Sequence, residues 1–303
     1  MAEHFDIIIV GGGPAGLTAA IYGRRAGRSV LLLEKSGFGG QIASSPRVEN
    51  YPGLPAVSGA ELADRLFSQA EALGARLELE EVSSVQNGSP LTVRTDYGCY
   101  TSSALILATG MTHRKLGLAG EDALQGISYC AVCDGAFYRD RDVAVCGGGN
   151  TALQDALFLS GLCRSVTVVH RRDAFRGDPI LTERLRKRDN VRLALDSVIE
   201  ALEGSDALEG IRIRNRRTGE TSSLPVSALF EAVGQRPEQA LSESLVGVDD
   251  AGFITAGESC VTSRPGIFAA GDCRVKEVRQ LTTACADGAV AATAAVRFLD
   301  AQE

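Results

Sequence analysis

Two segments of the chain share one pattern of apolar, glycine and polar positions. Each segment predicts a buried strand, a glycine-rich turn, a helix of small and apolar residues, and a second apolar strand. The two turns are Gly11-Gly-Gly-Pro-Ala-Gly16 and Gly147-Gly-Gly-Asn-Thr-Ala152, and the second strands end at Glu34 and His170. This order is typical of the βαβ unit, in which the helix N-terminus holds the pyrophosphate of a dinucleotide. The pattern therefore predicts two dinucleotide sites.

The remaining pattern predicts an α/β fold in which one domain is inserted into another. Before the second unit we expect an amphipathic helix at 59–73, a β-meander at 76–100 and a strand at 104–108. After it we expect a β-rich stretch at 191–224 and a strand at 228–233. A short strand at 266–270 and an Ala-rich helix at 281–299 form a tail that should pack on the first segment. We predict two Rossmann-like, three-layer (ββα) domains, 1–112 with 238–303 and 113–237.

Composition and charge narrow the class of protein. With 303 residues, 45% of them hydrophobic and 23% charged, the chain is an ordinary globular protein of about two domains. A net charge of −7 without a long Lys/Arg run argues against a nucleic-acid partner. The apolar segments are well short of the ~20 residues that span a bilayer. Because the start also lacks a leader pattern, we expect a cytoplasmic protein with no membrane partner.

The ends of the two second strands distinguish the ligands. Glu34 can accept hydrogen bonds from a ribose diol, which suits an adenosine without a 2′-phosphate. The second copy has no carboxylate there but has His170-Arg-Arg172, with Arg176 shortly after. Guanidinium groups in this place suit a 2′-phosphate, although a solvated basic helix start is an alternative. The second site is therefore predicted to prefer NADPH to NADH.

A further motif points to a flavin at the first site. Gly271-Asp272 follows an apolar strand in the tail and resembles the motif with which flavoproteins hold the ribityl and phosphate portion. An ordinary strand-to-loop turn with an Asp cap is the alternative for this motif in isolation. We expect the first site to hold the flavin.

A cysteine pair precedes the second glycine turn. Cys130 and Cys133 can close a small disulfide ring in a first helical turn, whose N-terminal dipole would favour thiolate. A C-x-x-C beside a βαβ unit predicts redox activity rather than half of a zinc site. No second pair and only three histidines exist, so no metal is expected. Asp134 is the best placed general acid, unless it is only a turn residue. The other six cysteines are expected to be small buried residues.

Across nearly its whole length the chain resembles the low-molecular-weight thioredoxin reductases. The resemblance rests on motifs in a specific order: Gly11-Gly-Gly-Pro-Ala-Gly16, Gly39-Gly-Gln41, Glu49-Asn-Tyr-Pro-Gly53, Ala108-Thr-Gly110, Cys130-Ala-Val-Cys-Asp134, Gly147-Gly-Gly-Asn-Thr-Ala152, His170-Arg-Arg172 with Arg176, and Ala269-Ala-Gly-Asp272 with Arg279-Gln280. It implies a homodimer that passes electrons from NADPH through FAD to the cysteine pair and on to thioredoxin or a similar protein. It also implies that Cys133 is the flavin-proximal sulfur, that Asp134 protonates the departing thiolate, and that Cys130 attacks thioredoxin.

The resemblance also implies two sets of cofactor-binding residues. The set for FAD is Gly11, Gly13, Pro14, Ala15, Gly16, Glu34, Lys35, Gly40, Gln41, Asn50, Ala108, Thr109, Gly110, Gly271, Asp272, Arg279, Gln280 and Leu281. The set for NADPH is Gly149, Asn150, Thr151, Arg171, Arg172 and Arg176.

The sequence departs from the family pattern in two places, and other functions share the build. Gln154 and Asp155 stand where the family often has two glutamates, and Gln125 where it often has a basic residue. A reductase for another dithiol protein is one alternative, and a small-molecule dithiol oxidase that uses oxygen is another. The three arginines argue against such an oxidase and against ferredoxin-driven relatives. A non-enzymatic flavin-binding or redox-sensing protein is the alternative from a different class.

Overall fold

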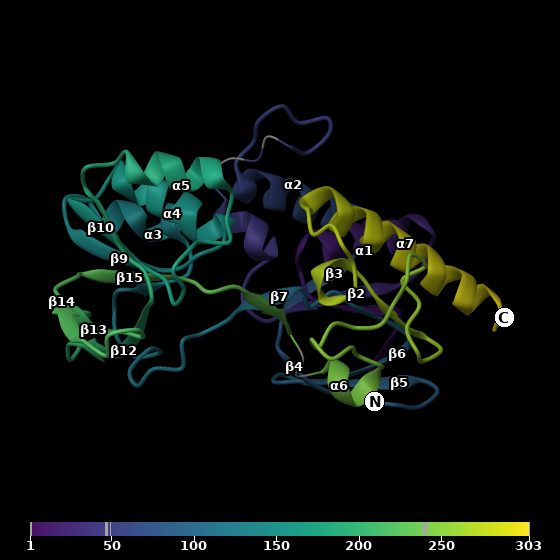
Figure 1. The fold of residues 1–303 in the computed structure, drawn as a ribbon. Helices are drawn as coiled ribbons and strands as arrows, with labels where there is room; N and C mark the ends of the chain where they lie inside the picture. Colours follow the sequence, from purple (N-terminus) through teal and green to yellow (C-terminus); the bar gives the residue numbers. More distant parts are fainter. Residues whose placement is uncertain (1, 46–47, 49, 239–240, 303) are drawn as a thin grey trace. The chain divides into compact units, whose positions relative to one another are not determined.

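The computed structural model describes residues 2–45, 48, 50–238 and 241–302, apart from the side chain of Cys133. It divides into two compact units, Met1–Thr112 with Arg236–Glu303 (unit 1) and His113–Gln235 (unit 2) (Figure 1). Unit 2 is thus inserted into unit 1. The two strands at the chain crossings, β7 (Met111–His113) and β16 (Gln235–Pro237), pair with each other.

Unit 1 is built on a seven-stranded sheet. Its path is β3-β2-β1-β6-β5-β4, and β17, from the C-terminal tail, also pairs with β6. Four pairs in it are parallel: β1 with β2 and β6, β2 with β3, and β6 with β17. The strands are β1 (Glu3–Val10), β2 (Val30–Glu34), β3 (Arg76–Leu79), β4 (Val82–Gln86), β5 (Leu91–Thr95), β6 (Cys99–Leu107) and β17 (Ile267–Ala269).

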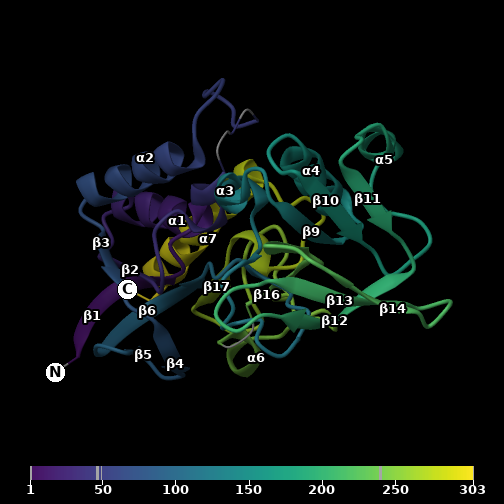
Figure 2. The same cartoon turned by 90° about the vertical axis from the view of Figure 1, so that its left-hand side faces the viewer.

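Helices cover one face of this sheet, which explains the continuous apolar run in β1. Ile7 and Ile9 pack under α1, α2 and α7, whereas Ile8 and Val10 face the opposite core, so both faces are buried (Figures 1 and 2). A Cβ on Gly288 of α7 would lie 2.2 Å from the Ala15 carbonyl oxygen, so this glycine permits close packing of α7 on α1. The helices on this face are α1 (Pro14–Arg25), α2 (Gly59–Ala72) and α7 (Leu281–Asp300), whereas α6 (Ser242–Leu245) packs in the opposite core. Unit 1 also has 3-10 turns at Gly40–Ser44 and Gly271–Cys273.

Unit 2 has three layers. Its parallel sheet, in the order β11-β10-β9-β15-β8, has α3, α4 and α5 on one face and the antiparallel sheet β12-β13-β14 on the other (Figures 1 and 2). The elements are β8 (Ile127–Ser128), α3 (Ala131–Asp134), a 3-10 turn (Gly135–Tyr138), β9 (Asp142–Gly147), α4 (Asn150–Ser160), β10 (Ser165–Val169), α5 (Pro179–Arg186), β11 (Val191–Ala194), β12 (Ser197–Glu203), β13 (Gly210–Asn215), β14 (Thr221–Leu224) and β15 (Ala228–Ala232).

The predicted α/β class is confirmed, with one correction in the 76–100 stretch. This segment is not one meander, because β3 pairs in parallel with β2 after the α2 crossover. The β-rich stretch predicted at 191–224 is confirmed: β11 joins the parallel sheet after α5, and β12–β14 form an antiparallel layer. The helices α2 and α5 carry the chain back across the sheet, so that β3 and β11 run parallel to β2 and β10. The alternation of residues within a strand does not predict this direction. None of the described helices has the length and apolarity to cross a membrane.

Candidate functional site

Three predicted segments of unit 1 converge on the first glycine turn. Gly11 has a φ of 110°, and a Cβ there would lie 2.3 Å from the Ala108 carbonyl oxygen. A Cβ on Gly40 would lie 3.2 Å from the Cα of Gly13, and one on Gly271 would lie 2.9 Å from the Cβ of Ala15. The segment after β6, the 3-10 turn after β2 and the tail motif therefore all meet the start of α1.

The start of α1 has the form of an anion site. Gly13 is the N-cap and provides no side-chain cap, and Pro14 occupies the first helical turn. Space is open around Gly13, since no heavy atom would lie within 4 Å of an added Cβ. The free N–H groups of a helix start and the positive end of its dipole attract a pyrophosphate there.

Glu34 at the end of β2 stabilises the glycine turn through a hydrogen bond. One carboxylate oxygen accepts the Gly12 N–H at 2.6 Å, and the other accepts the Ser36 N–H at 2.9 Å and the Ser36 hydroxyl at 3.1 Å. A Cβ on Gly12 would overlap Glu34, which explains why glycine is needed there. Glu34 is thus positioned beside the pyrophosphate site, where its carboxylate can address a ribose diol.

The tail motif contains polar atoms that fit the dinucleotide predicted for unit 1. Asp272 Oδ1 and Arg279 Nε are buried and find no hydrogen-bond partner among the described residues. Burial raises the pKa of Asp272. Arg279 stacks on Phe253, with its guanidinium carbon 4.1 Å from the ring centroid. Buried polar atoms usually have partners, so these two fit contacts to a hydroxylated, phosphorylated ligand.

Asp287 on α7 anchors the same tail motif, and the sequence did not indicate it. Its carboxylate accepts the Gly271 N–H at 3.0 Å, two nitrogens of Arg274 at 2.8 and 2.7 Å, and Lys276 Nζ at 2.9 Å. Because Asp287 is only 6% exposed, this network fixes the backbone that carries Asp272. An Asp in the middle of an Ala-rich helix was the one available signal.

Four further residues of the predicted flavin set make polar contacts within unit 1. Asn50 Nδ2 donates to Gln280 Oε1 at 3.1 Å, so these two predicted residues lie together. Gln41 Nε2 donates to the Met111 carbonyl at 2.9 Å, beside Gly110. Lys35 instead pairs with Glu238 at 3.2 Å, and Leu281 begins α7. Glu49, part of one quoted motif, lies outside the described residues.

The second glycine turn repeats the geometry of the first. A Cβ on Gly147 would lie 2.4 Å from the Ala232 carbonyl, and one on Gly148 would overlap the His170 ring at 2.2 Å. Gly149 is the N-cap of α4 without a side-chain cap, and the space around it is open. The second turn therefore also offers a helix start to a pyrophosphate. Asn150 Oδ1 accepts the Asp178 N–H at 2.7 Å, and Thr151 is exposed.

The predicted arginines lie on a loop that folds back over this turn. The N–H groups of Arg176 and Gly177 donate to the Gly148 carbonyl at 2.8 and 3.1 Å. The side chains of Arg171, Arg172 and Arg176 are exposed. His170 is buried, and its Nε2 donates to the Ala174 carbonyl at 3.1 Å. Burial, followed by the neighbouring arginines, lowers its pKa. The positive charge beside the turn therefore belongs to the arginines.

The structure adds a fourth arginine to this cluster. Arg216, in the turn between β13 and β14, donates from Nη1 to the Arg171 carbonyl at 3.1 Å. Arg216 could not be predicted from the sequence, because α5, β11, β12 and β13 lie between the arginine loop and this turn along the chain.

The redox segment lies in unit 2, with α3 packed on α4. Cys130 is disulfide-bonded, and the Cys133 side chain lies outside the described residues, so the pairing of these two cysteines stays a prediction. Asp134 Oδ2 accepts a hydrogen bond from the Ser128 hydroxyl at 2.7 Å. The Cys130 N–H donates to that same hydroxyl at 3.1 Å. Ser128 therefore joins the disulfide-bonded cysteine to the predicted general acid.

The helix predicted at the pair is present but short. It is the single turn α3, followed directly by a 3-10 turn, and the effect of its N-terminal dipole on a thiolate stays a prediction. Gly135 follows α3 and packs closely on α4, since a Cβ on it would lie 2.9 Å from the Leu159 side chain.

The other six cysteines are free, as expected. Five are buried and Cys99 is half-buried. Burial raises the pKa of the Cys273 thiol, which lies 3.3 Å from the Ala270 carbonyl beside the tail motif. Of the residues that depart from the family pattern, Gln125 and Gln154 are exposed, while burial raises the pKa of Asp155 to about 6.

A buried pair of carboxyl groups lies behind the nucleotide-binding sheet. Glu231 on β15 is 2% exposed, and burial together with Glu121 raises its pKa to about 8. Burial alone would raise the pKa of Glu121, but hydrogen bonds from Leu118, Glu231, Gly117 and Leu116 lower it. At neutral pH Glu231 therefore keeps its proton and donates it to ionised Glu121.

We expect Glu231→Gln to stabilise the protein at alkaline pH. The folded protein holds a proton on Glu231 that the unfolded chain releases above its ordinary pKa of 4.5, so stability is lost as pH rises from 4.5 to about 8. Glutamine keeps a donor for Glu121 without this loss. The gain should be about 1–3 kcal/mol at pH 8 and should shrink towards pH 5.

Differential scanning calorimetry between pH 5 and 9 measures this effect. Glu209→Gln, at an exposed position of the same unit, is the control and should leave the pH dependence as it is. If the stability of Glu231→Gln and of the unsubstituted protein changed with pH in the same way, Glu231 and Glu121 would not share a proton.

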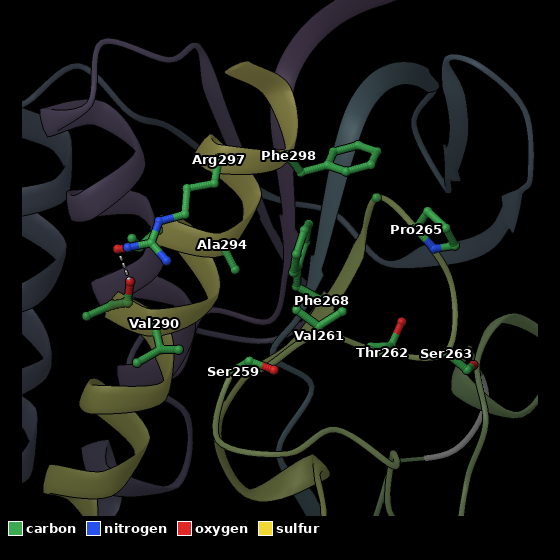
Figure 3. A pocket seen from close by; sticks show the side chains of 13 residues that line it. Ser259, Val261, Thr262, Ser263, Pro265, Phe268, Val290, Ala294, Arg297 and Phe298 are labelled. Atoms are coloured by element: carbon green, nitrogen blue, oxygen red, sulfur yellow. Dashed lines mark hydrogen bonds between the residues drawn. The ribbon is translucent and has the colours of Figure 1, made fainter. Parts of the chain in front are cut away.

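An apolar groove lies elsewhere on unit 1, between α7 and the 259–268 segment (Figure 3). Val261, Phe268, Val290 and Phe298 contribute its apolar lining, and Arg297 lies at its edge. None of the predicted site residues lines this groove, so it is separate from the chemistry described above.

Comparison with known proteins agrees with the site. The family model of the pyridine nucleotide-disulphide oxidoreductases matches residues 5–288. A thioredoxin reductase of Mycolicibacterium smegmatis is 42% identical over 98% of this chain and 97% of its own. The crystal structure of Lactococcus lactis thioredoxin reductase has a TM-score of 0.88 at 38% identity, covering 98% of this chain and 99% of that one. The crystal structure of T. acidophilum thioredoxin reductase has a TM-score of 0.85 at 32% identity, covering 99% of this chain and 100% of that one.

These similarities extend over both units and include both glycine turns and the redox segment. Flavin and pyridine-nucleotide use accordingly follow from the family. The chain belongs to the thioredoxin reductases within the pyridine nucleotide-disulphide oxidoreductase family.

Proposed function

We propose that this protein uses NADPH and FAD to reduce the disulfide of thioredoxin through Cys130 and Cys133. The observation that carries the proposal is the arrangement in unit 2, where disulfide-bonded Cys130 and the carboxylate of Asp134 share the Ser128 hydroxyl. An acid held beside a disulfide is what reduction to two thiols requires, because the departing thiolate must be protonated.

The two cofactors are assigned to the units by the chemistry of their turns. FAD belongs to residues 1–112 with 238–303, where Glu34 suits a ribose diol and Asp272 and Arg279 have buried atoms without partners. NADPH belongs to residues 113–237, where Arg171, Arg172 and Arg176 supply cations for a 2′-phosphate. A bound flavin supplies two-electron transfer between a nicotinamide and a disulfide.

The residues of the chain then have separate tasks. The helix starts at Gly13 and Gly149 bind the pyrophosphates. Cys133 is the sulfur proximal to the flavin, and Asp134 gives a proton to the thiolate released from Cys130. Cys130, as a thiolate, attacks the disulfide of the partner protein and forms a mixed disulfide, which Cys133 resolves. The active-site disulfide is thereby restored and the partner leaves with two thiols.

Thioredoxin is the proposed partner because the relatives that match along the whole chain carry that name. We also propose a homodimer, as the resemblance implies, and a cytoplasmic location. The free state of the six other cysteines supports a reducing compartment. Sedimentation velocity at micromolar concentration should give the mass of two chains.

Steady-state NADPH oxidation tests the function. The purified protein should be yellow and should sustain NADPH oxidation over many turnovers only when thioredoxin and a chromogenic disulfide are both supplied. Turnover of the chromogenic disulfide without thioredoxin would indicate a different disulfide substrate. Rapid oxygen consumption with a small dithiol would instead indicate an oxidase.

A further inference from the structure

Ser128 is a buried polar residue that neither the sequence motifs nor the family assignment singles out. It ends β8 and is 4% exposed. Its position is fixed by the parallel pairing of β8 with β15, in which Ser128 lies opposite Phe230. A side chain held by strand pairing and by the contacts of its own hydroxyl can orient its neighbours.

The hydroxyl group makes three contacts, all within the redox segment. It accepts the Cys130 N–H at 3.1 Å, and it can donate to Asp134 Oδ2 at 2.7 Å or to the Cys130 carbonyl at 3.3 Å. A hydroxyl has one proton to donate, and the shorter contact to a carboxylate is the stronger one. Ser128 therefore donates to Asp134 while it holds the Cys130 backbone.

We propose that Ser128 is the positioning residue that makes Asp134 an effective acid for the Cys130 sulfur, a role that rests on the proposed function. Asp134 Oδ2 is occupied as an acceptor of the Ser128 proton, so the transferable proton resides on Oδ1. In the same contact, the hydroxyl holds the Asp134 carboxyl group in one orientation. The hydrogen bond from the Cys130 N–H to the Ser128 hydroxyl fixes the position of the Cys130 backbone relative to Asp134.

The step balances as follows. Reduction of one disulfide to two thiols consumes two electrons and two protons. A flavin held by unit 1 would supply the electron pair that NADPH provides, and the S–S bond breaks. The sulfur of Cys130 leaves as a thiolate and takes the proton from Asp134 Oδ1. Asp134 is left as a carboxylate that takes a new proton from water, and the second thiol takes its proton from solvent.

Ser128→Ala is expected to slow the disulfide half of the reaction about 10- to 100-fold, a fraction of what a general acid contributes. The kcat with thioredoxin should fall, and its KM should change by no more than about twofold, because no thioredoxin contact is removed. The flavin of the variant should remain bleached during turnover, because its reoxidation has become the slow step. Ser128→Thr keeps the hydroxyl and should recover most of the rate.

Two controls separate positioning from general destabilisation. Ser197 is also buried in unit 2 and donates to a nearby backbone carbonyl, that of Leu195, at 2.8 Å, so Ser197→Ala is the matched control and should retain the rate. In an Asp134→Asn background, Ser128→Ala should add little further loss, because both changes remove the same function.

The outcomes are distinguishable. Equal losses in the NADPH half and the disulfide half, or full additivity with Asp134→Asn, would show that Ser128 has only a structural role and would overturn the inference. An unchanged rate in Ser128→Ala would overturn it as well. If the flavin of the unsubstituted protein does not bleach with NADPH, the proposed function itself fails, whatever Ser128 does.

Discussion

Cys130→Ser and Cys133→Ser are each expected to lower thioredoxin reduction about 10³-fold or more, since removal of an essential nucleophile leaves only residual activity. Bleaching of the flavin by NADPH should persist in both variants, because that half of the reaction precedes the sulfur chemistry. Stopped-flow absorbance of the flavin with NADPH, followed by a steady-state thioredoxin assay, measures the two halves separately.

Cys99→Ser is the matched control for these variants. Cys99 is free and half-buried in unit 1, at the start of β6, so its replacement should leave the rate as it is. Thioredoxin reduction that survives in both redox-segment variants would remove Cys130 and Cys133 from the electron path.

The second large effect concerns the nucleotide preference. The triple change of Arg171, Arg172 and Arg176 to alanine should lower kcat/KM for NADPH about 10²- to 10³-fold, because each guanidinium–phosphate contact is worth about 1.5–3 kcal/mol when well formed. The kcat/KM for NADH should change little, since NADH has no 2′-phosphate. Flavin-reduction rates with each nucleotide give both values.

Arg188→Ala provides the control for charge alone. Arg188 is exposed on the same unit, beyond the end of α5, and its loss changes the net charge without touching the arginine loop. A fall of equal size for NADPH and NADH in the triple variant would mean that the arginines maintain the loop rather than recognise the phosphate.

Much of the fold was predictable, because the hydrophobic pattern of most segments agrees with how deeply they are buried. The run before Gly11 is apolar throughout, and β1 is indeed buried on both faces. The strand pairings of β3 and β11 were not predictable, because parallel pairing depends on where α2 and α5 return the chain. Alternation within these strands contains no information about their neighbours.

The candidate sites likewise contain residues that the sequence predicts and residues that it does not. Glycines that must approach another backbone closely, such as Gly11 and Gly147, were identified from the sequence because only their lack of a Cβ permits the contact. Three residues could not be predicted from the sequence, because their roles depend on contacts that no motif indicates. Asp287 binds the Gly271 N–H, Arg216 binds the Arg171 carbonyl, and Ser128 donates to Asp134. For Ser128, proximity to the cysteine pair was visible, but the direction of its hydroxyl was not.

An anaerobic titration of the purified flavoprotein with NADPH tests the central claim most directly, namely that electrons pass from NADPH through a flavin into one disulfide. Each of the two redox groups takes one electron pair, so full bleaching should require about two equivalents of NADPH per chain, and about one in Cys133→Ser. Complete bleaching of the unsubstituted protein after one equivalent, or a protein that binds no flavin, would contradict the account.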